Sequence, residues 1–387
     1  MEVIMISTIS QLLNLPGVTV QGCSEVEGFI CIHLEMTSSG ACCPHCGKYS
    51  EERHRERGIL IRDLPTFGQK VLLKVPRRQF YCHSCQCYFT EELEFLNPHR
   101  HQTKRYEENI YQRICSSTIE QISREENVSR DEIQGIFDAV YSTHQAKNWS
   151  EAKRLSIDEV AMHKGHKDFV GVVSDIDART LLEVAPSNSQ KDMTETLSQQ
   201  PIEVRKQVKE VSVDMWGGYA KVIKEIFPNA TIVFDRFHVI KGVNSELNRI
   251  RKDEGITDRG SKFILLKNFE DLSDAQEEKL IVILSRSETL TEAYILKEEL
   301  REIYETPYNV EEGMSEIEKW LNKAQSFYHE ATQTIRNHLQ GICNYFISRA
   351  TSGVMEGINN RIQLIKRQAY GFVNFNNFRS RLLASFS

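Results

Sequence analysis

Residues 155–185 have the sequence LSIDEVAMHKGHKDFVGVVSDIDARTLLEVA, which contains three short apolar runs. The runs comprise residues 155–160, 169–174 and 181–185. Each has the length and the β-branched content of a strand. The first run carries Asp158, and because side chains alternate along a strand, its neighbour Glu159 is expected on the opposite face. The stretch predicts a domain that begins with three strands and has a carboxylate on the first.

The pattern continues with a predicted helix at residues 191–209, the run VSVDMWGGY at residues 211–219 and a further strand at residues 231–239. The run at 211–219 predicts a short strand with Asp214 near its carboxyl end. Three strands, a helix, a strand, a second helix and a fifth strand is the element order of RNase H-like α/β domains. In that order the first and fourth strands are neighbours, so Asp158 and Asp214 are expected side by side.

A third carboxylate lies in the sequence SGVMEGINNRIQLIKR, residues 352–367, which predicts a helix with Glu356 in its first turn. Asn360 and Gln363 follow at i+4 and i+7, with Lys366 close behind, so one helix face combines an acid, amides and a base. Such a face suits DNA lying across a metal site. A solvated amphipathic helix has the same pattern and is the alternative.

Three carboxylates on rigid elements would hold hard cations such as Mg²⁺ or Mn²⁺. Breaking and rejoining DNA phosphodiesters requires in-line displacement at phosphorus, in which two divalent ions activate the attacking oxygen and stabilise the leaving oxygen. We therefore predict that Asp158, Asp214 and Glu356 are the catalytic and metal-binding residues.

The sequence Asp235-Arg-Phe-His238 comes at the end of the last predicted strand of this series. Its acid and its imidazole could support the metal centre, position a nucleic-acid strand or cap the following helix. We predict that Asp235, His238 and Asn360 lie close to the active site, with no defined chemistry.

Two Cys-x-x-Cys units stand near the N-terminus, at Cys43–Cys46 and Cys82–Cys85. Each short turn can present two thiolates, and four thiolates surround one Zn²⁺ tetrahedrally in a closed, structural site. The intervening sequence is strand-like, which favours a zinc ribbon with the cysteine pairs at the tips of two hairpins. Buried free cysteines are the alternative.

The sequence also suggests places for the neighbouring thiols and imidazoles. Cys42 and Cys87 adjoin the two units and are candidates to replace one of the four ligands, whereas His45 and His83 lie inside the units and are expected to be exposed. The other cysteines are expected in the core: Cys23, Cys31, Cys115 and Cys343.

Two capping-box patterns, Ser117-x-x-Glu120 and Ser129-x-x-Glu132, predict two helix starts about twelve residues apart. The shared apolar face would comprise Ile119, Ile122, Val128, Ile133 and Ile136. The short break at residues 127–129 fits the turn of a helix-turn-helix, with a plain helical hairpin as the alternative. Asp131 and Glu132 begin the second helix and would repel phosphates, so we assign no base-reading residues.

Charge is unevenly distributed along the chain, whose formal net charge is −6. Residues 253–318 hold 18 acidic and 7 basic side chains, a local net of −11, whereas residues 357–387 hold five basic and no acidic ones. A segregated basic surface can face phosphates even in an acidic protein. We predict DNA contacts from Arg77, Arg78, Arg361, Lys366 and Arg367.

The sequence closely resembles the ISL3 family of bacterial insertion-sequence transposases, which belong to the DDE group. The likeness rests on CPHCG, RRQFYCHSC with FTE, SIDEVAMHKGH, VSVDMWGGY, FDRFHVIK and SGVMEGINNRIQLIKRQAYGFVNF, and it spans nearly the whole chain. It implies a catalytic triad at Asp158, Asp214 and Glu356, with a helical insertion before the last catalytic helix. It also implies double-stranded DNA partners, namely terminal inverted repeats and target DNA, and a homo-oligomeric synaptic complex.

We accordingly expect a multi-domain α/β protein. Its predicted parts are a zinc-ribbon DNA-binding domain at 1–97, a helix-turn-helix region at 98–150, the first part of an RNase H-like catalytic domain at 151–240, a helical insertion at 241–348 and the last part of the catalytic domain at 349–387. No apolar run reaches about 18 residues and no signal peptide is evident. We therefore expect a bacterial, cytoplasmic and nucleoid-associated protein without membrane contact.

Three other functions are consistent with parts of the sequence. A non-catalytic regulator would use the zinc ribbon and the helix-turn-helix alone and would not depend on the three carboxylates. A zinc hydrolase would need an open zinc site, but the chain has no HExxH motif and an all-cysteine site is closed. A structural protein that binds DNA without cutting it would have no need of the set Asp158, Asp214 and Glu356.

Overall fold

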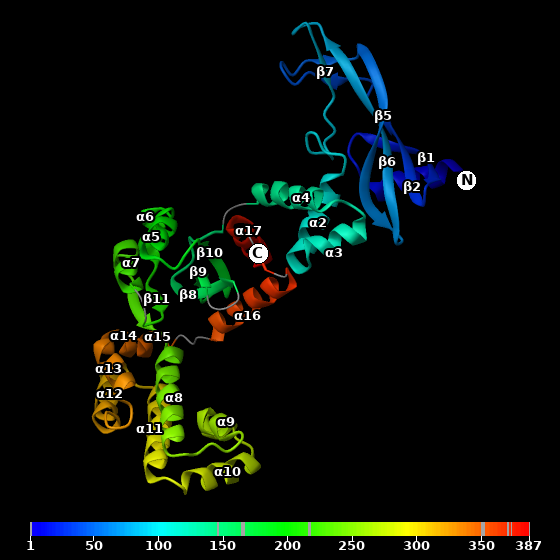
Figure 1. Ribbon diagram of the computed structural model, residues 1–387. Coiled ribbons are helices and arrows are strands. Elements are labelled where there is room, and N and C mark those ends of the chain that lie inside the picture. Colours follow the sequence, from blue (N-terminus) through cyan, green and yellow to red (C-terminus); the bar gives the residue numbers. More distant parts are fainter. Residues whose placement is uncertain are drawn as a thin grey trace. The chain divides into compact units, whose positions relative to one another are not determined.

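The computed structural model describes residues 2–144, 147–163, 167–215, 218–349, 353–369, 371–372 and 374–386. The chain divides into two compact units, residues 1–145 and 146–387, and each has a hydrophobic core of its own (Figure 1). No helix in the described part of the chain is long and apolar enough to cross a membrane.

The first unit is built around a five-stranded sheet. Its strands, in order, are β1 (Val18–Val26), β2 (Phe29–Met36), β6 (Gln69–Cys82) and β5 (Arg53–Thr66), with β7 (Cys87–Thr90) paired to β6. Strands β5 and β6 form a long antiparallel hairpin. Alternate residues of β6 are apolar, so Val71, Leu73 and Val75 are buried on one face. Helix α1 (Glu2–Leu13) packs against β1.

Three helices follow the sheet of the first unit: α2 (Lys104–Ser116), α3 (Ile119–Glu126) and α4 (Arg130–Thr143). Ser129 caps α4 as predicted, because its side chain accepts the backbone N–H of Glu132. The predicted cap at Ser117 is wrong by one residue, since Thr118 accepts the N–H of Gln121 and begins α3. Asn127 ends α3 in the left-handed conformation, which turns the chain into α4.

The second unit contains a five-stranded sheet with the order β10-β9-β8-β11-β12. Its strands are β8 (Arg154–His163), β9 (Lys167–Asp175), β10 (Thr180–Ala185), β11 (Glu210–Val213) and β12 (Thr231–Phe234). The first three are antiparallel neighbours, whereas β8, β11 and β12 run parallel. This is the strand arrangement of an RNase H-like domain, as the sequence predicted.

Two elements of this domain, one helix and one strand, differ from the predicted ones. The helix expected at 191–209 is divided into α5 (Gln190–Ser198) and α6 (Ile202–Gln207), because Pro201 stands at the break between them. The strand expected at 231–239 ends at Phe234, because Asp235 caps a helix instead. Helix α7 (Tyr219–Ile226) connects β11 to β12.

A helical insertion separates β12 from the last two helices. It comprises α8 (Arg236–Asp253), α9 (Ser261–Leu266), the 3₁₀ turn η1 (Phe269–Asp271), α10 (Asp274–Leu284), α11 (Glu288–Glu305), α12 (Val310–Ala324), α13 (His329–Asn337), α14 (Leu339–Cys343) and α15 (Tyr345–Ser348). Trp320 and Tyr328 are buried in its core and donate to backbone carbonyls of α11. Helix α8 begins before residue 241, so the predicted start of the insertion falls inside a helix.

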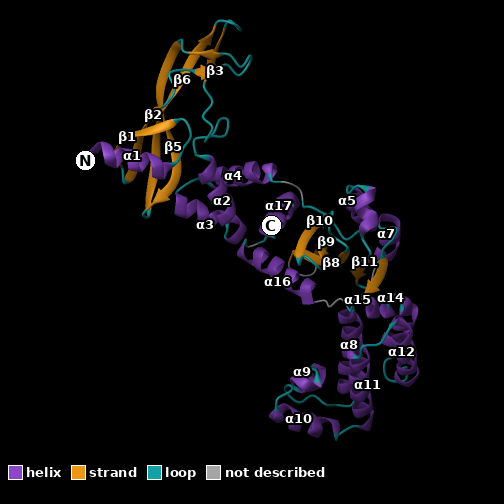
Figure 2. Cartoon of the chain, turned by 180° about the vertical axis from the view of Figure 1, so that it is seen from behind, coloured by secondary structure: helices purple, strands orange, loops and turns teal. Residues whose placement is uncertain are grey.

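Helices α16 (Gly353–Gln368) and α17 (Phe375–Ser385) return the chain to the sheet. Helix α16 contacts β8 and α17 contacts β10, and Figures 1 and 2 both show these helices beside β8–β10. Apolar residues at helical spacing face inward: Met355, Ile358, Ile362 and Ile365. This buried stripe fixes which other residues of α16 can face the strands.

The cysteines outside the two Cys-x-x-Cys units follow the predicted burial only in part. Cys31 and Cys343 are buried as expected, and Cys115 is half-buried. Cys23 is exposed, so its predicted core position is wrong. The pairing of β1 with β2 shifts register between Val20 and Gly22, and most residues beyond the shift are exposed.

Candidate catalytic centre and metal site

Four cysteine sulfurs converge in the first unit. Cys43 and Cys46 lie between β3 (Ala41–Cys42) and β4 (Tyr49–Ser50), whereas Cys82 and Cys85 lie where β6 turns into β7. The four Sγ atoms lie within 4.8 Å of one another, with 3.9 Å between Cys43 and Cys85 and 3.6 Å between Cys46 and Cys82. Tetrahedral zinc with Zn–S bonds of about 2.3 Å needs sulfur separations of about 3.8 Å. The four sulfurs therefore fit one zinc ion.

The surroundings of the cysteine cluster agree with a structural site. Phe80 and Phe89 are buried against Cys43 and Cys82, so the site has an apolar wall. Gly47 has a φ of 72°, and its N–H donates to the carbonyl of Cys43 over 2.8 Å, which closes the first turn.

The thiols and imidazoles next to this cluster stand outside it. Cys42 and Cys87 do not belong to the group of four, although both adjoin it in sequence. His45 and His83 are exposed, as predicted, and His83 pairs with Glu52.

Asp158 and Asp214 lie at corresponding positions of two parallel strands. Ile157 of β8 is paired with Val213 of β11, and each aspartate follows its paired residue by one position. Because paired residues of parallel strands lie at one level, the two aspartates stand side by side at the carboxyl end of β11. Glu159 turns to another neighbour, since its Oε1 accepts the hydroxyl of Tyr219 over 2.9 Å.

Asp235 and His238 border this pair of aspartates. Asp235 follows β12 and caps α8 by accepting the N–H of Phe237 over 2.9 Å. His238 lies one turn further, with its Nδ1 3.0 Å from Oδ2 of Asp214. His238 thus contacts Asp214, and Asp235 performs the capping role that the sequence left open.

The pKa values of these two groups reflect the negative charge around them. Burial raises the pKa of Asp235, and the charges of Asp158 and Asp214 raise it further. For His238, burial lowers the pKa, but the hydrogen bond and charge of Asp214 outweigh burial, so the pKa is raised. The site is an acidic cluster that favours positive charge.

Helix α16 is tied to β8 at two points. The amide nitrogen of Asn359 donates to Oδ2 of Asp158 over 2.6 Å, and Lys366 donates to the carbonyl of Ala161. Glu356 lies one turn before Asn359 and is exposed. Asn360, the amide that the sequence predicted for the site, is also exposed.

In the part of the chain that the structure describes, the four cysteines are the one group of three or more metal-ligating side chains gathered around a single position. Asp158, Asp214 and Glu356 are not drawn together that closely. Their joint binding of catalytic ions therefore stays a prediction. The donor set itself is suitable, since carboxylate oxygens are the ligands that Mg²⁺ and Mn²⁺ prefer.

The basic residues predicted to contact DNA fall into two groups. Arg78 is 2% exposed and its guanidinium is bound to Glu91, with Nη2 2.7 Å from Oε2. Arg361 donates to the carbonyl of Ser385, and Lys366 is held by Ala161 as described above. These three side chains have partners inside the protein. Arg367 is exposed and its Nε donates to the backbone carbonyl of Gln363 over 3.3 Å, and Arg77 is half-buried.

Arg77 belongs to a basic cleft of the first unit with a volume of about 520 Å³. Its lining is Arg55, Arg57, Arg77, Arg78, Gln79, Thr90, His99, Arg100 and His101. No carboxylate lines this cleft in the described part of the chain. Arg100 also donates to the carbonyl of Gly135 in α4, which connects the cleft to the second helix of the helix-turn-helix.

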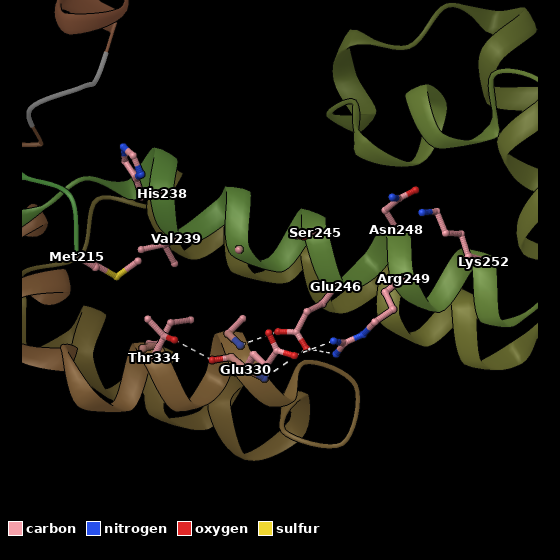
Figure 3. A pocket seen from close by; sticks show the side chains of 13 residues that line it. Met215, His238, Val239, Ser245, Glu246, Asn248, Arg249, Lys252, Glu330 and Thr334 are labelled. Atoms are coloured by element: carbon pink, nitrogen blue, oxygen red, sulfur yellow. Dashed lines mark hydrogen bonds and ion pairs between the residues drawn. The ribbon is translucent and has the colours of Figure 1, made fainter. Parts of the chain in front are cut away.

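A second hollow, of about 530 Å³, runs along α8 from Met215 and His238 (Figure 3). Figure 3 shows Glu246 and Arg249 directed toward α13, where they meet Glu330. The carboxylate of Glu246 accepts the N–H groups of Glu330 and Ala331, so it caps α13. The residues on this side of α8 therefore stabilise its packing against α13.

Two contacts of the site could not be anticipated. Asn359 and Asn360 are both one turn from Glu356, and only the packing of α16 selects Asn359 as the partner of Asp158. The sequence did not predict the hydrogen bond between Glu159 and Tyr219 either. The alternation of side chains along β8 indicated only that Glu159 points away from Asp158.

A cysteine ribbon, a helix-turn-helix and an RNase H-like sheet with paired aspartates together define a protein that acts on nucleic acid. Comparison with protein families gives the particular group. The model of the ISL3 transposase matches residues 155–382, more than half of the chain. Models of the zinc-finger of transposases IS204/IS1001/IS1096/IS1165 and of the helix-turn-helix domain of transposase family ISL3 match residues 39–85 and 91–141. The chain belongs to the ISL3 family of transposases.

Curated relatives agree with this family. The transposase for insertion sequence element IS1001 of Bordetella parapertussis is 28% identical over 373 residues, which covers 92% of this chain and 91% of the relative. The transposase for insertion sequence element IS1557 of Mycobacterium tuberculosis is 26% identical over 259 residues, which covers 58% of each chain. The zinc-ribbon match and the four converging sulfurs together indicate a structural zinc.

Proposed function

We propose that this transposase binds the terminal inverted repeats of its insertion sequence and catalyses metal-dependent DNA strand cleavage and strand transfer. The observation that carries the proposal is the register of β8 and β11, which sets Asp158 beside Asp214. The hydrogen bond from Asn359 adds to it, because it holds the helix of Glu356 against the same strand. We further propose that it acts on nucleoid DNA in the bacterial cytoplasm.

We assign the binding of two Mg²⁺ or Mn²⁺ ions to Asp158, Asp214 and Glu356. When bound, such ions activate the attacking oxygen and stabilise the leaving oxygen at phosphorus. His238 orients the carboxylate of Asp214 through the 3.0 Å contact, and Asn359 orients that of Asp158 through the 2.6 Å hydrogen bond. Asp235 fixes the start of α8 and thereby the position of His238.

We assign recognition of double-stranded DNA to the first unit. Its basic cleft offers arginines from β5 and β6, among them Arg77, and supplies the positive charge that the acidic start of α4 lacks. In the second unit Arg361 and Arg367 are both exposed, and we assign the phosphate contact to Arg367 because Arg361 donates to the carbonyl of Ser385. The family's terminal repeats occur in pairs, and we propose that a homo-oligomer joins two of them and captures target DNA.

The test compares the wild-type chain with Asp214→Asn on a labelled fragment of the element's own terminus, with Mg²⁺ or with EDTA. Asp177→Asn is the matched control, because Asp177 is paired with Arg154 at the opposite end of β8. We expect Mg²⁺-dependent nicking and strand transfer from the wild type and the control. Asp214→Asn should bind the DNA and cut none of it.

The alternative is a non-catalytic regulator derived from a transposase, which binds DNA through its zinc ribbon and helix-turn-helix. Equal binding by all three proteins, with no cutting under Mg²⁺ or Mn²⁺, would establish that alternative.

A further inference from the structure

A groove of about 380 Å³ lies between α8 and α9 and begins next to the candidate catalytic centre. Its lining is Phe237, Ile240, Lys241, Asn244, Ser245, Asn248, Lys262 and Leu266. Phe237 stands between Asp235 and His238 in the sequence, and its ring packs edge-on against His238 with 5.4 Å between the ring centres. The groove therefore starts where the aspartates are and leads away from them along the insertion.

The charge of this groove is opposite to that of its surroundings. Two lysines and no carboxylate line it, although residues 253–318 as a whole have a local net charge of −11. Three acids of α8 and the segment that follows it are engaged elsewhere: Glu246 caps α13, Asp258 pairs with Arg286 and Glu270 pairs with Arg301. Within the described part of the chain, Lys241 and Lys262 form no ion pair. A groove with this charge attracts phosphates.

The polar and aromatic groups of the groove suit bases more than they suit a phosphate alone. Phe237 is 52% exposed, so part of its ring is open to solvent, and the ammonium of Lys241 lies 5.9 Å from the ring centre. The Oδ1 of Asn244 is buried and has no hydrogen-bond partner in the described structure. An unpaired base offers both a ring that stacks on phenylalanine and amino groups that donate to an amide oxygen.

The groove also has a direction. Phe237, Lys241, Ser245 and Asn248 follow one another at steps of three or four residues, so they form a stripe along one face of α8. From Phe237 to Asn248 this stripe is about 16 Å long. Figure 3 shows Asn248 and Lys252 directed away from the side of α8 on which Glu246 and Glu330 meet.

We infer that this groove binds unpaired nucleotides of the DNA strand next to the cleavage site, with a base stacked on Phe237 and phosphates beside Lys241 and Lys262. The inference rests on the proposed function, because a DNA strand bound at the catalytic centre would continue into the groove. Its volume matches a site for one or two nucleotides, and a paired base could not reach the phenyl ring.

The experiment uses the full chain and a terminal duplex with a short unpaired flank that carries 5-iododeoxyuridine. Irradiation crosslinks this base to a stacked aromatic ring, and peptide mapping identifies the residue. We expect the crosslink at Phe237. Phe237→Leu should remove it and weaken binding of the unpaired flank roughly tenfold, whereas Phe237→Trp should retain both.

Phe269→Leu is the matched control. Phe269 is 48% exposed, close to the value for Phe237, but it stands beside Glu270 and Asp271. It should leave the crosslink and the affinity unchanged. Melting curves of all variants show that the losses do not come from unfolding.

A second probe separates the inference from the proposed function. A single-stranded oligonucleotide of arbitrary sequence that crosslinks Phe237 supports the groove, even if terminal DNA is never cut. Crosslinks confined to residues 1–145, with equal affinities of wild type and Phe237→Leu for the unpaired flank, overturn the inference. That result would leave cleavage of terminal DNA, and hence the proposed function, unaffected.

Discussion

The amide nitrogen of Asn359 lies 2.6 Å from Oδ2 of Asp158, across 201 residues of sequence. This hydrogen bond joins the helix that carries Glu356 to the strand that carries the first aspartate. Among the described residues, the Oδ1 of the same amide is buried and has no hydrogen-bond partner, so the contact seen for this side chain is the one to the carboxylate. Asn359 thus positions α16 on the sheet.

Removing this contact should impair catalysis more than DNA binding. In Asn359→Ala the helix loses the tie to β8 that lies closer to Glu356, and a displacement of about 1 Å at Glu356 can reduce the rate about a hundredfold. We expect a large loss of Mg²⁺-dependent strand cleavage with an unchanged affinity for terminal DNA. Gln368→Ala, an exposed change on the same helix, should cut like the wild type. Equal losses of binding and cleavage would contradict the positioning role.

Zinc should be bound by four cysteines and by no others. We expect one zinc per chain by elemental analysis, and Cys82→Ser should lose it and unfold the first unit, because the metal contributes folding energy. Cys87→Ser is the matched control, since Cys87 adjoins the cluster without belonging to it. Loss of zinc from Cys87→Ser would show that the ligand set is different.

The buried pair of Arg78 and Glu91 should matter for stability. Both side chains are less than 5% exposed, so Arg78→Ala leaves a carboxylate buried without its partner, at a cost of about 3–5 kcal/mol. Arg53→Ala removes the exposed pair with Glu56 and should cost about 0–1 kcal/mol. Urea unfolding of both variants measures the difference, and similar midpoints would refute the structural role of Arg78.

Unlike Arg78, whose role is in stability, Arg77 should contact the phosphates of DNA. Arg77→Ala removes one cation from the basic cleft, so affinity for DNA of any sequence should fall and the slope of log K against log salt should decrease by about 1. Lys206→Ala, on an exposed part of α6, should leave the slope unchanged. Fluorescence anisotropy over a series of salt concentrations gives both values. An unaltered slope for Arg77→Ala would exclude a phosphate contact.

Glu246, which lines the hollow shown in Figure 3, should stabilise the insertion by capping α13. Glu246→Ala exposes the first N–H groups of α13 to a site without an acceptor, which should cost about 1–3 kcal/mol. Glu330→Ala is the control, because Glu330 forms an exposed pair with Arg249 whose loss should leave the stability almost unchanged. Calorimetry would show the loss in the second unit alone. Equal effects of the two changes would disprove the capping role.

The sequence was sufficient for features that depend on local pattern. Alternation of apolar residues identified β8 and β11 and placed an aspartate at corresponding positions of both, since a strand has a fixed repeat of two residues. The short spacing of the cysteine pairs likewise determined the metal cluster. Each strand and each cysteine pair can be recognised from its own residues, although the fold brings them together.

Features that depend on distant partners could not be predicted. Arg78 has the sequence signature of a phosphate contact, but Glu91 on the following segment occupies it. Asn359 and Asn360 both lie one turn from Glu356, and only the packing of the apolar stripe of α16 decides between them. Cys23 has an apolar type, but the register shift in β1 left it exposed.

The insertion also governs the order in which the second unit can be assembled. Its last helices return to the sheet, where the amide of Asn344 donates to the carbonyl of Ile232 in β12 over 2.8 Å. Folding of the insertion shortens the loop that α16 must close before it reaches β8, and so reduces the entropy lost in that step. Because Asp158 and Asp214 precede the insertion in the sequence and Glu356 follows it, the ribosome releases the two aspartates first and the glutamate last.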